Sequence, residues 1–199
     1  MPPKTTSEKG AAKSGTAAKS NNGAAEKPAR KRQTKAAVEK VARSYFDAVK
    51  RRDPDAMADH WHADGIEDIV PLGVFRGPEG VRTLFREMFA AVPDIEFAVD
   101  AITADGKAAA VRWRAEGTFT GRRFQDLEPT GGRITLRGCD VLEVEDGKLT
   151  RNTAFYDGAD FARGVGMLPA RDSGGERAMK SAFNAATKAR KRIDALRTR

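Results

Sequence analysis

The chain has 199 residues, of which 36 are Lys or Arg and 28 are Asp or Glu, so its formal net charge is +8. Its apolar runs are far shorter than the roughly 20 residues that span a bilayer, and no apolar stretch follows the N-terminal lysines. We therefore expect no membrane partner and no secretory signal. The single cysteine, Cys139, excludes an internal disulfide, and no Cys or His residues have zinc-ligand spacing. These features predict a cytoplasmic protein without a metal site.

The positive charge lies at the two ends of the chain. Residues 1–35 carry net +7 and residues 171–199 carry net +6, which leaves −5 for residues 36–170. The first segment lacks aromatic residues, Leu, Ile and Val, so it cannot offset an ordering cost of about 1–2 kcal/mol per residue. We expect residues 1–35 to be disordered. They are either a solubilising extension or an arm for nonspecific attachment to nucleic acid.

Residues 171–199 are predicted to form a basic helical tail. Ser173 and Glu176 have the spacing of a capping box at the start of a helix. The apolar residues that follow recur close to one helical face, and they are Met179, Phe183, Ala186, Ile193 and Leu196. Such a helix could pack on residues 36–170, pair with a partner or lie exposed.

Residues 36–170 form one predicted domain in which helices precede strands. Helical spacing of apolar residues and helix-start signals predict three helices, over 36–51, from Asp53 to about Trp61, and over 78–92. Alternating apolar residues predict strands over 65–70, 95–100, 111–116, 134–145 and 148–156. Asp-Gly pairs at 105–106 and 146–147 predict hairpin turns. The fold class is therefore α+β, with one curved antiparallel sheet whose inner face is covered by the three helices.

Three polar side chains on apolar faces form a candidate acid/base set. Asp140 shares a strand face with aliphatic residues, so its carboxyl group is either hydrogen-bonded by a partner or protonated. Asp68 shares a face with Ile66 and Val70, and Tyr45 lies on the apolar stripe of the first helix. The alternatives are structural: Asp140 bonds backbone in a sheet bend, Asp68 faces water, and Tyr45 is a core residue. Together the three could exchange protons with a bound molecule.

Aromatic side chains are the candidate substrate-binding residues of the same interior. Their structural alternative is to fill the core rather than to line a cavity. These residues are Trp61, Phe89, Phe97, Trp113 and Tyr156.

Six short motifs follow one another between residues 36 and 169. They are Val92-Pro-Asp-Ile-Glu-Phe97, residues 110–121, Pro129-Thr-Gly131, Gly138-Cys-Asp-Val-Leu142, Asp146-Gly-Lys-Leu149 and Gly164-Val-Gly-Met-Leu-Pro169. Together they resemble the polyketide-cyclase-like (SnoaL-like) branch of the nuclear transport factor 2-like (NTF2-like) superfamily. The resemblance implies a cone-shaped α+β barrel around a deep apolar pocket, usually in a homodimer. It also implies aldol-type ring closure with an aspartate as acid/base, to which we match Asp157.

A second branch is similar over shorter stretches. Residues 42–68, Cys139-Asp-Val-Leu142 and Ala154-Phe-Tyr156 resemble the Δ5-3-ketosteroid isomerases. That resemblance implies Asp68 as the proton-shuttling base, with Tyr45 and Asp140 as donors to the oxyanion of an enolate. The sequence departs from the cyclase branch at Phe119, Asn152 and Thr153, where histidines or a His-Trp pair are common, so those proton carriers are missing.

The sequence thus predicts a small-molecule pocket protein. Its expected activity is cofactor-free proton transfer, as an isomerase or an aldol-type cyclase, on a hydrophobic carbonyl compound such as a polyketide or a steroid-like molecule. The alternative is a non-catalytic ligand-binding or interaction module whose basic tails bind nucleic acid or a protein partner.

Overall fold

The computed structural model describes residues 33–197. Its helices are α1 (Lys35–Lys50), α2 (Pro54–Ala58), α3 (Gly77–Ala91), α4 (Gly158–Gly164) and α5 (Gly174–Arg197). Its strands are β1 (Trp61–Ile69), β2 (Gly73–Arg76), β3 (Glu96–Ala104), β4 (Ala108–Thr118), β5 (Arg133–Glu145) and β6 (Lys148–Tyr156). Residues 1–32 of the predicted disordered segment 1–35 lie outside the described residues. Residues 33–35 correct that prediction, because Gln33 donates a hydrogen bond to the carbonyl oxygen of Val144, Thr34 caps α1 and Lys35 is its first residue. Of the described helices, none is both long and apolar enough to cross a membrane.

The helices of the domain begin at the residues that cap them. The side chain of Thr34 accepts a hydrogen bond from the backbone N–H of Ala37 at the start of α1. Asp53 does the same for Ala56 in α2, where Pro54 occupies the first turn. The apolar stripes of α1 and α3 are buried, as their spacing predicts: Val38, Ala42, Tyr45, Val49, Val81, Leu84 and Phe85. The helices over 36–51 and 78–92 are therefore confirmed.

The six strands form one curved sheet in the order β2-β1-β6-β5-β4-β3. All neighbours are antiparallel except β1 and β6, which run parallel. This parallel pair corrects the prediction of a wholly antiparallel sheet. α3 carries the chain from β2, at one edge of the sheet, to β3, at the other edge. The strands β3 to β6 then lead back across the sheet, and β6 pairs with β1 in the same direction. The short strand β2 was also not predicted. Gly73 and Gly77 lie at its two ends, and such closely spaced glycines are typical of a loop.

Both predicted hairpin turns are present. The carboxyl oxygen Oδ1 of Asp105 accepts hydrogen bonds from the backbone N–H groups of Lys107 and Ala108, at 2.6 and 2.8 Å. Asp146 and Gly147 both have positive φ, of 47° and 78°, which is the conformation that favours Asp-Gly in a two-residue hairpin loop. These turns fix the register of the strands that carry the candidate site.

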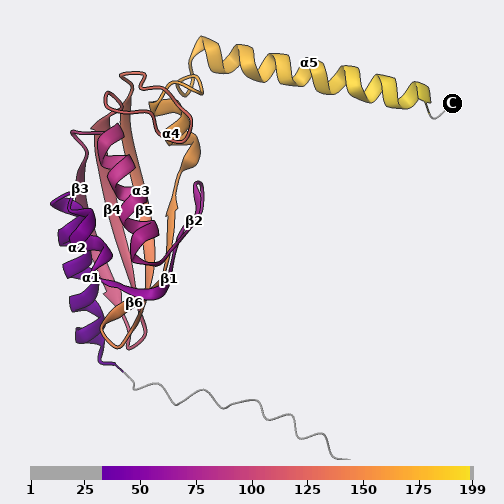
Figure 1. Ribbon diagram of the computed structural model, residues 1–199. Helices are drawn as coiled ribbons and strands as arrows, with labels where there is room; N and C mark the ends of the chain where they lie inside the picture. The colour runs from indigo at the N-terminus through magenta and orange to yellow at the C-terminus, as the bar shows by residue number, and fades with distance from the viewer. Residues whose placement is uncertain (1–32, 198–199) are drawn as a thin grey trace, which may run out of the picture.

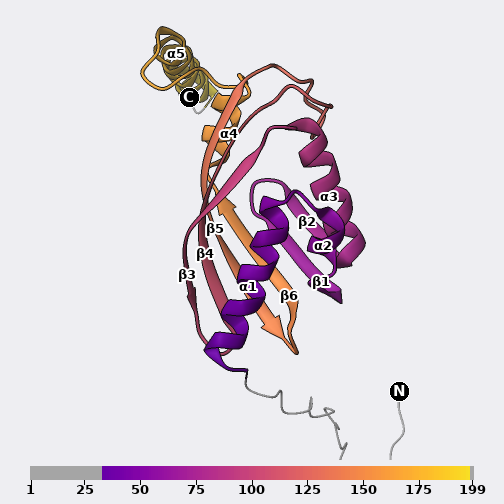
Figure 2. The ribbon, with the colours of Figure 1, turned by 90° about the vertical axis from the view of Figure 1, so that its left-hand side faces the viewer.

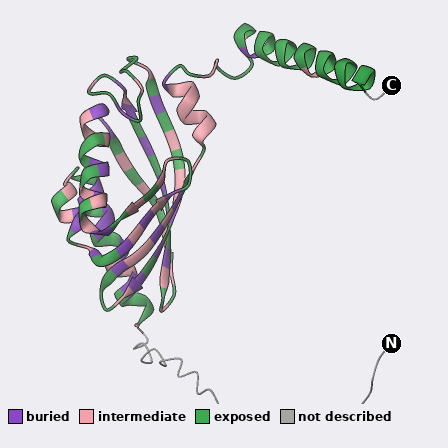
Figure 3. Ribbon diagram, turned by 45° about the vertical axis from the view of Figure 1, so that its right-hand side comes forward, coloured by how far each residue is buried: buried purple, intermediate pink, exposed green. Residues whose placement is uncertain are grey.

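The helices α1, α2 and α3 cover the concave face of the sheet, and the core lies between them (Figures 1 and 2). Buried and exposed residues alternate along the strands (Figure 3). The opposite face of the sheet carries exposed apolar residues such as Val141 and Phe155. The expected α+β class, with a curved sheet covered by three helices, is confirmed.

Gly138 in β5 offers a test of how closely the sheet packs. A Cβ atom there would lie 2.2 Å from Trp113 Cζ2 and 2.7 Å from the carbonyl oxygen of Phe155. Gly138→Ala should therefore lower the free energy of unfolding by about 1–3 kcal/mol, because the indole must move. Gly174→Ala is the matched control, since the nearest atom to its added Cβ is an Arg177 Nη2 at 3.9 Å. Equal urea-unfolding curves for the two variants would contradict this packing.

Candidate functional site

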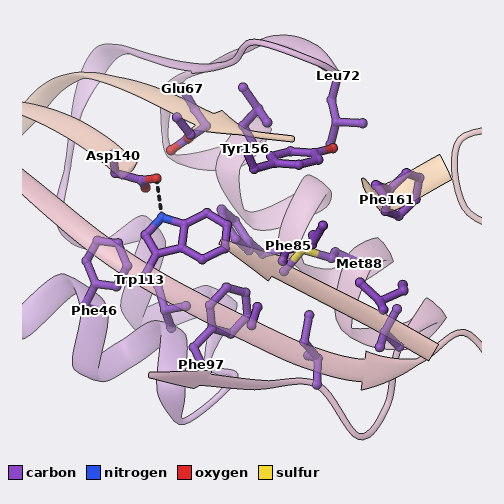
Figure 4. A pocket seen from close by; sticks show the side chains of 18 of the residues that line it. Phe46, Glu67, Leu72, Phe85, Met88, Phe97, Trp113, Asp140, Tyr156 and Phe161 are labelled. Carbon is purple, nitrogen blue, oxygen red and sulfur yellow. Dashed lines mark hydrogen bonds between the residues drawn. The ribbon is translucent and has the colours of Figure 1, made fainter. Parts of the chain in front are cut away.

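A cavity of about 90 Å³ lies between the concave face of the sheet and the helices α1 and α3 (Figure 4). Its walls are almost entirely apolar and rich in aromatic rings, including Phe46, Phe85, Phe97, Trp113, Phe124 and Phe161. Leu72, Tyr156 and Phe161 are only partly buried, so their end of the cavity is nearer to solvent. The volume is several times what one water molecule needs.

Two carboxyl groups lie at the other end of the cavity (Figure 4). Asp140 comes from β5 and Glu67 from β1, and these strands flank β6 on its two sides. Their exposed fractions are 7% for Asp140 and 1% for Glu67. Asn152 of β6 pairs in register with Glu67, so its side chain lies between the two carboxyl groups.

Hydrogen bonds connect these groups into a carboxyl cluster, which we define as Tyr45, Glu67, Trp113, Asp140 and Asn152. The amide Nδ2 of Asn152 donates to Glu67 Oε1 at 2.9 Å and to Asp140 Oδ2 at 2.8 Å. The hydroxyl of Tyr45 donates to Glu67 Oε2 at 3.4 Å, and the indole Nε1 of Trp113 donates to Asp140 Oδ1 at 2.7 Å. Each carboxyl oxygen thus accepts one hydrogen bond, while the buried Oδ1 of Asn152 has no partner among the described residues.

Burial raises the pKa of both carboxyl groups. It raises the pKa of Asp140 from 3.8 to about 6, although the hydrogen bonds from Trp113 and Asn152 act in the opposite direction. Burial, and next the charge of Asp140, raise the pKa of Glu67 well above its usual value. Burial likewise raises the pKa of the Tyr45 phenol. The two buried carboxyl groups therefore both bind a proton more tightly than free carboxyl groups do, and the charge of one makes it harder to ionise the other.

The structure corrects the prediction that Asp68 faces the interior. Asp68 does share a face with Ile66 and Val70, but that face is the outer one, where Val70 is 54% exposed. There a carboxyl oxygen of Asp68 lies 3.4 Å from a guanidinium nitrogen of Arg151. The neighbouring residue, Glu67, faces the cavity instead, so Asp68 does not meet Tyr45 and Asp140.

Asp157 also lies apart from the carboxyl cluster, and its contacts are those of a helix cap. Its Oδ1 accepts hydrogen bonds from the backbone N–H groups of Ala159 and Asp160 at the start of α4, at 2.9 and 3.2 Å. Its Oδ2 accepts one from Arg171 at 3.3 Å. Asp157 does not line the cavity, so its position gives no support to the role of acid/base that the resemblance implied.

The predicted aromatic residues divide into two groups. Phe97, Trp113 and Tyr156 line the cavity. Trp61 and Phe89 do not line it: Trp61 packs edge-to-face on Tyr45 with ring centroids 6.1 Å apart, and Phe89 lies 5.8 Å from the ring of Phe85.

Sequence reasoning missed Glu67 and the bridging role of Asn152. A signal for Glu67 was present, because it shares its strand parity with Trp61, Gly65 and Ile69, which are all buried. For Asn152 the sequence signals only that it stands where the cyclase branch often has a histidine or a His-Trp pair.

A family model supplies the relationship of this fold to known proteins. The model of the SnoaL-like domain matches residues 42–152, which is more than half of the chain and extends from α1 to Asn152 in β6. The chain belongs to the SnoaL-like domain family. A comparison with curated proteins gave no significant match.

Solved structures with this SnoaL-like fold agree with the family assignment. A proposed SnoaL-like polyketide cyclase from Jannaschia sp. CCS1 is 17% identical, with a TM-score of 0.61 over 68% of this chain and 95% of its own. AclR, a proposed hydroxylase from Streptomyces galilaeus, is 22% identical, with a TM-score of 0.61 over 80% and 98%. A Catenulispora acidiphila protein with a ketosteroid isomerase-like fold is 13% identical, with a TM-score of 0.55 over 63% and 92%. At these identities the likeness shows the fold of the SnoaL-like domain.

Stability measured against pH tests the buried state of Asp140. Because burial raises the pKa of Asp140 to about 6, the folded protein binds this proton more tightly than the unfolded chain does. The free energy of unfolding should fall by up to about 3 kcal/mol between about pH 4 and pH 6, and this contribution is fully lost above that range. Asp140→Asn lacks this titrating group, so its free energy of unfolding should fall less over the same range, where Glu67 still contributes a loss of the same sign. An equal fall in the two proteins, measured by urea unfolding at each pH, would contradict the prediction.

Proposed function

We propose that this SnoaL-like protein is a cofactor-free enzyme that transfers a proton beside the carbonyl group of a hydrophobic molecule. The observation that carries the proposal is the carboxyl cluster, in which Asn152 bridges two buried carboxyl groups at one end of an otherwise apolar cavity. Paired groups whose environments separate their pKa values are a common basis for acid/base catalysis.

We assign different roles to the two carboxyl groups. Asp140, whose pKa lies at about 6, is largely ionised at neutral pH and can act as the general base. We assign the proton of the pair to Glu67, whose pKa is raised well above its usual value by burial and by the charge of Asp140, so that it can donate a hydrogen bond to a carbonyl oxygen. In this proposal Asp140 replaces Asp68 as the base, and Glu67 replaces Asp140 as the donor.

The rest of the carboxyl cluster orients these groups. The indole of Trp113 holds one oxygen of Asp140, and the amide of Asn152 holds the other. A carboxylate offers about four lone-pair directions, so Asp140 can still accept a proton from a bound molecule. Tyr45, which belongs to α1, donates its hydroxyl hydrogen bond to Glu67. Its role in this proposal is to hold Glu67 in position and not to contact the substrate.

The reaction follows from this arrangement. Asp140 takes a proton from the carbon next to the carbonyl, the electrons of that C–H bond form an enolate, and Glu67 stabilises the enolate oxygen by its hydrogen bond. Asp140 can then return the proton to another carbon, which gives an isomer. In an aldol-type cyclisation the enolate carbon instead bonds to a second carbonyl carbon of the same molecule, the C=O double bond of that carbonyl opens to an alkoxide, and the alkoxide takes back the proton that Asp140 holds. Asp140 is ionised again at the end of either reaction.

The cavity restricts the substrate class. Between the partly exposed end, at Leu72 and Phe161, and the carboxyl cluster, its walls are aromatic and aliphatic apart from the hydroxyl of Tyr156. A substrate should therefore carry its reacting carbonyl at the end that enters first and be apolar behind it. Cyclic and fused-ring ketones meet this description.

Deuterium exchange at the carbon beside a ketone tests the proposed reaction directly. We expect the protein to accelerate the exchange of cyclohexanone or 2-tetralone in D2O, followed by proton NMR. Asp140→Asn and Glu67→Gln should each slow the exchange by at least about 100-fold, because a positioned acid or base contributes about that factor. Asp68→Asn and Asp157→Asn are the matched controls and should stay close to the unmodified rate.

Two results would contradict parts of this proposal. Binding of both ketones without any exchange would identify a non-catalytic ligand-binding module. Loss of exchange in Asp68→Asn, with exchange retained in Asp140→Asn, would return the role of base to the residue that the sequence predicted.

The pH dependence of the same exchange tests the role of Asn152. Its amide hydrogen bond lowers the pKa of Asp140, against the larger effect of burial. In Asn152→Leu, which keeps a similar side-chain volume, the midpoint of the rise in rate with pH should therefore move to higher pH. A merely structural role for Asn152 would reduce the rate without moving this midpoint.

A further inference from the structure

We propose that α5 is an interfacial helix that binds the surface of an anionic lipid membrane. α5 projects away from the domain, and its residues are exposed along almost its whole length (Figures 1 and 3). Within residues 33–197 it packs extensively on no other helix or strand. This inference rests on the surface of α5 and is independent of the proposed reaction.

The start of α5 is fixed to the domain. The Ser173 hydroxyl accepts a hydrogen bond from the backbone N–H of Glu176 at 3.1 Å, which confirms the predicted helix start. The buried carboxylate of Glu176 accepts one from the backbone N–H of Asp172 at 2.8 Å and lies 3.9 Å from a guanidinium nitrogen of Arg163 in α4. The helix therefore leaves the domain in a defined direction, with both of its long faces open.

The two long faces of α5 differ in chemistry. Helical periodicity places four large apolar side chains and several alanines on one side; the large ones are Met179, Phe183, Ile193 and Leu196, with exposed fractions of 43%, 71%, 53% and 74%. The same periodicity places five cations on the opposite side: Arg177, Lys180, Lys188, Lys191 and Arg192. With seven cationic and two anionic residues, α5 has a net charge of +5.

An anionic bilayer surface is complementary to both the apolar and the basic face of α5, whereas nucleic acid and a second copy of α5 are each complementary to one face only. Duplex nucleic acid would neutralise the cations but leave Phe183 and Leu196 in water. A second copy of α5 would cover the apolar face but would bring together two helices of net charge +5. At a membrane, the apolar side chains enter the boundary with the acyl chains while the cations face anionic headgroups. Arg190 and Arg197, which lie within the apolar stripe, can extend their long side chains to the headgroups.

This mode of binding requires no membrane span. A helix of 24 residues extends for about 36 Å, which is ample for contact along a bilayer surface. The sequence expectation of no membrane partner rested on the absence of a span and of a signal sequence. A charged helix that lies in the interface needs neither a span nor a signal sequence to bind a membrane.

Vesicle sedimentation of the full chain tests the proposal. We expect binding to vesicles of phosphatidylcholine and phosphatidylglycerol and none to phosphatidylcholine alone. The double variant Phe183→Ser/Leu196→Ser keeps every charge, and its partition coefficient should fall at least about tenfold, because two exposed apolar side chains no longer enter the lipid. Val70→Ser/Val74→Ser is the matched control, since these residues of the domain are 54% and 51% exposed, and it should bind like the unmodified chain.

Three results would overturn the proposal. The first is no binding of the unmodified chain to anionic vesicles at low salt. The second is equal binding of the Phe183→Ser/Leu196→Ser variant, which would assign the attraction to charge alone, as for nucleic acid. The third is a dimer in analytical ultracentrifugation that this variant dissociates, which would identify a second copy as the occupant. Circular dichroism shows whether the variant keeps its helix content.

Discussion

The burial of two carboxyl groups beside one amide nitrogen is the constraint on which the interior of this protein depends. Glu67 and Asp140 both bond to Asn152 Nδ2, in a cavity whose other walls are apolar. Two ionised carboxylates there would lack solvation and repel each other, so the fold favours a proton on at least one of them. Tyr45 and Trp113 reduce the cost of burying the pair, because each donates a hydrogen bond to a carboxyl oxygen that Asn152 does not reach.

The sheet topology creates this meeting of side chains. β6 lies between β1 and β5, so Asn152 stands between Glu67 on one side and Asp140 on the other. The parallel pairing of β1 with β6 is therefore as important for the site as the hairpin that joins β5 to β6. The turn at 146–147 fixes the second pairing locally, whereas the first depends on the path of the whole domain.

Sequence reasoning succeeded where the signal was local and failed where it was not. The helices, the two Asp-Gly turns and the inward face of Asp140 each follow from residues within one segment. β1 carried an ambiguous pattern, since Ile66 and Ile69 point to opposite faces, and which face is inner depends on strands far away in the sequence. The contact of Asn152 with both carboxyl groups likewise needs the order of β1, β6 and β5, which no single segment encodes.

The two proposals meet in the region between α4 and α5. Phe161 of α4 lines the cavity near its more exposed end, and Arg163 of the same helix lies beside Glu176 at the start of α5. A membrane bound by α5 would thus be anchored close to the end at which an apolar substrate enters. Because residues 36–170 carry net −5, an anionic surface repels the domain while it attracts the helix. In this proposal the projecting basic helix binds the surface while the acidic domain stays away from it. Apolar molecules dissolved in the lipid then have only a short distance to travel to the cavity.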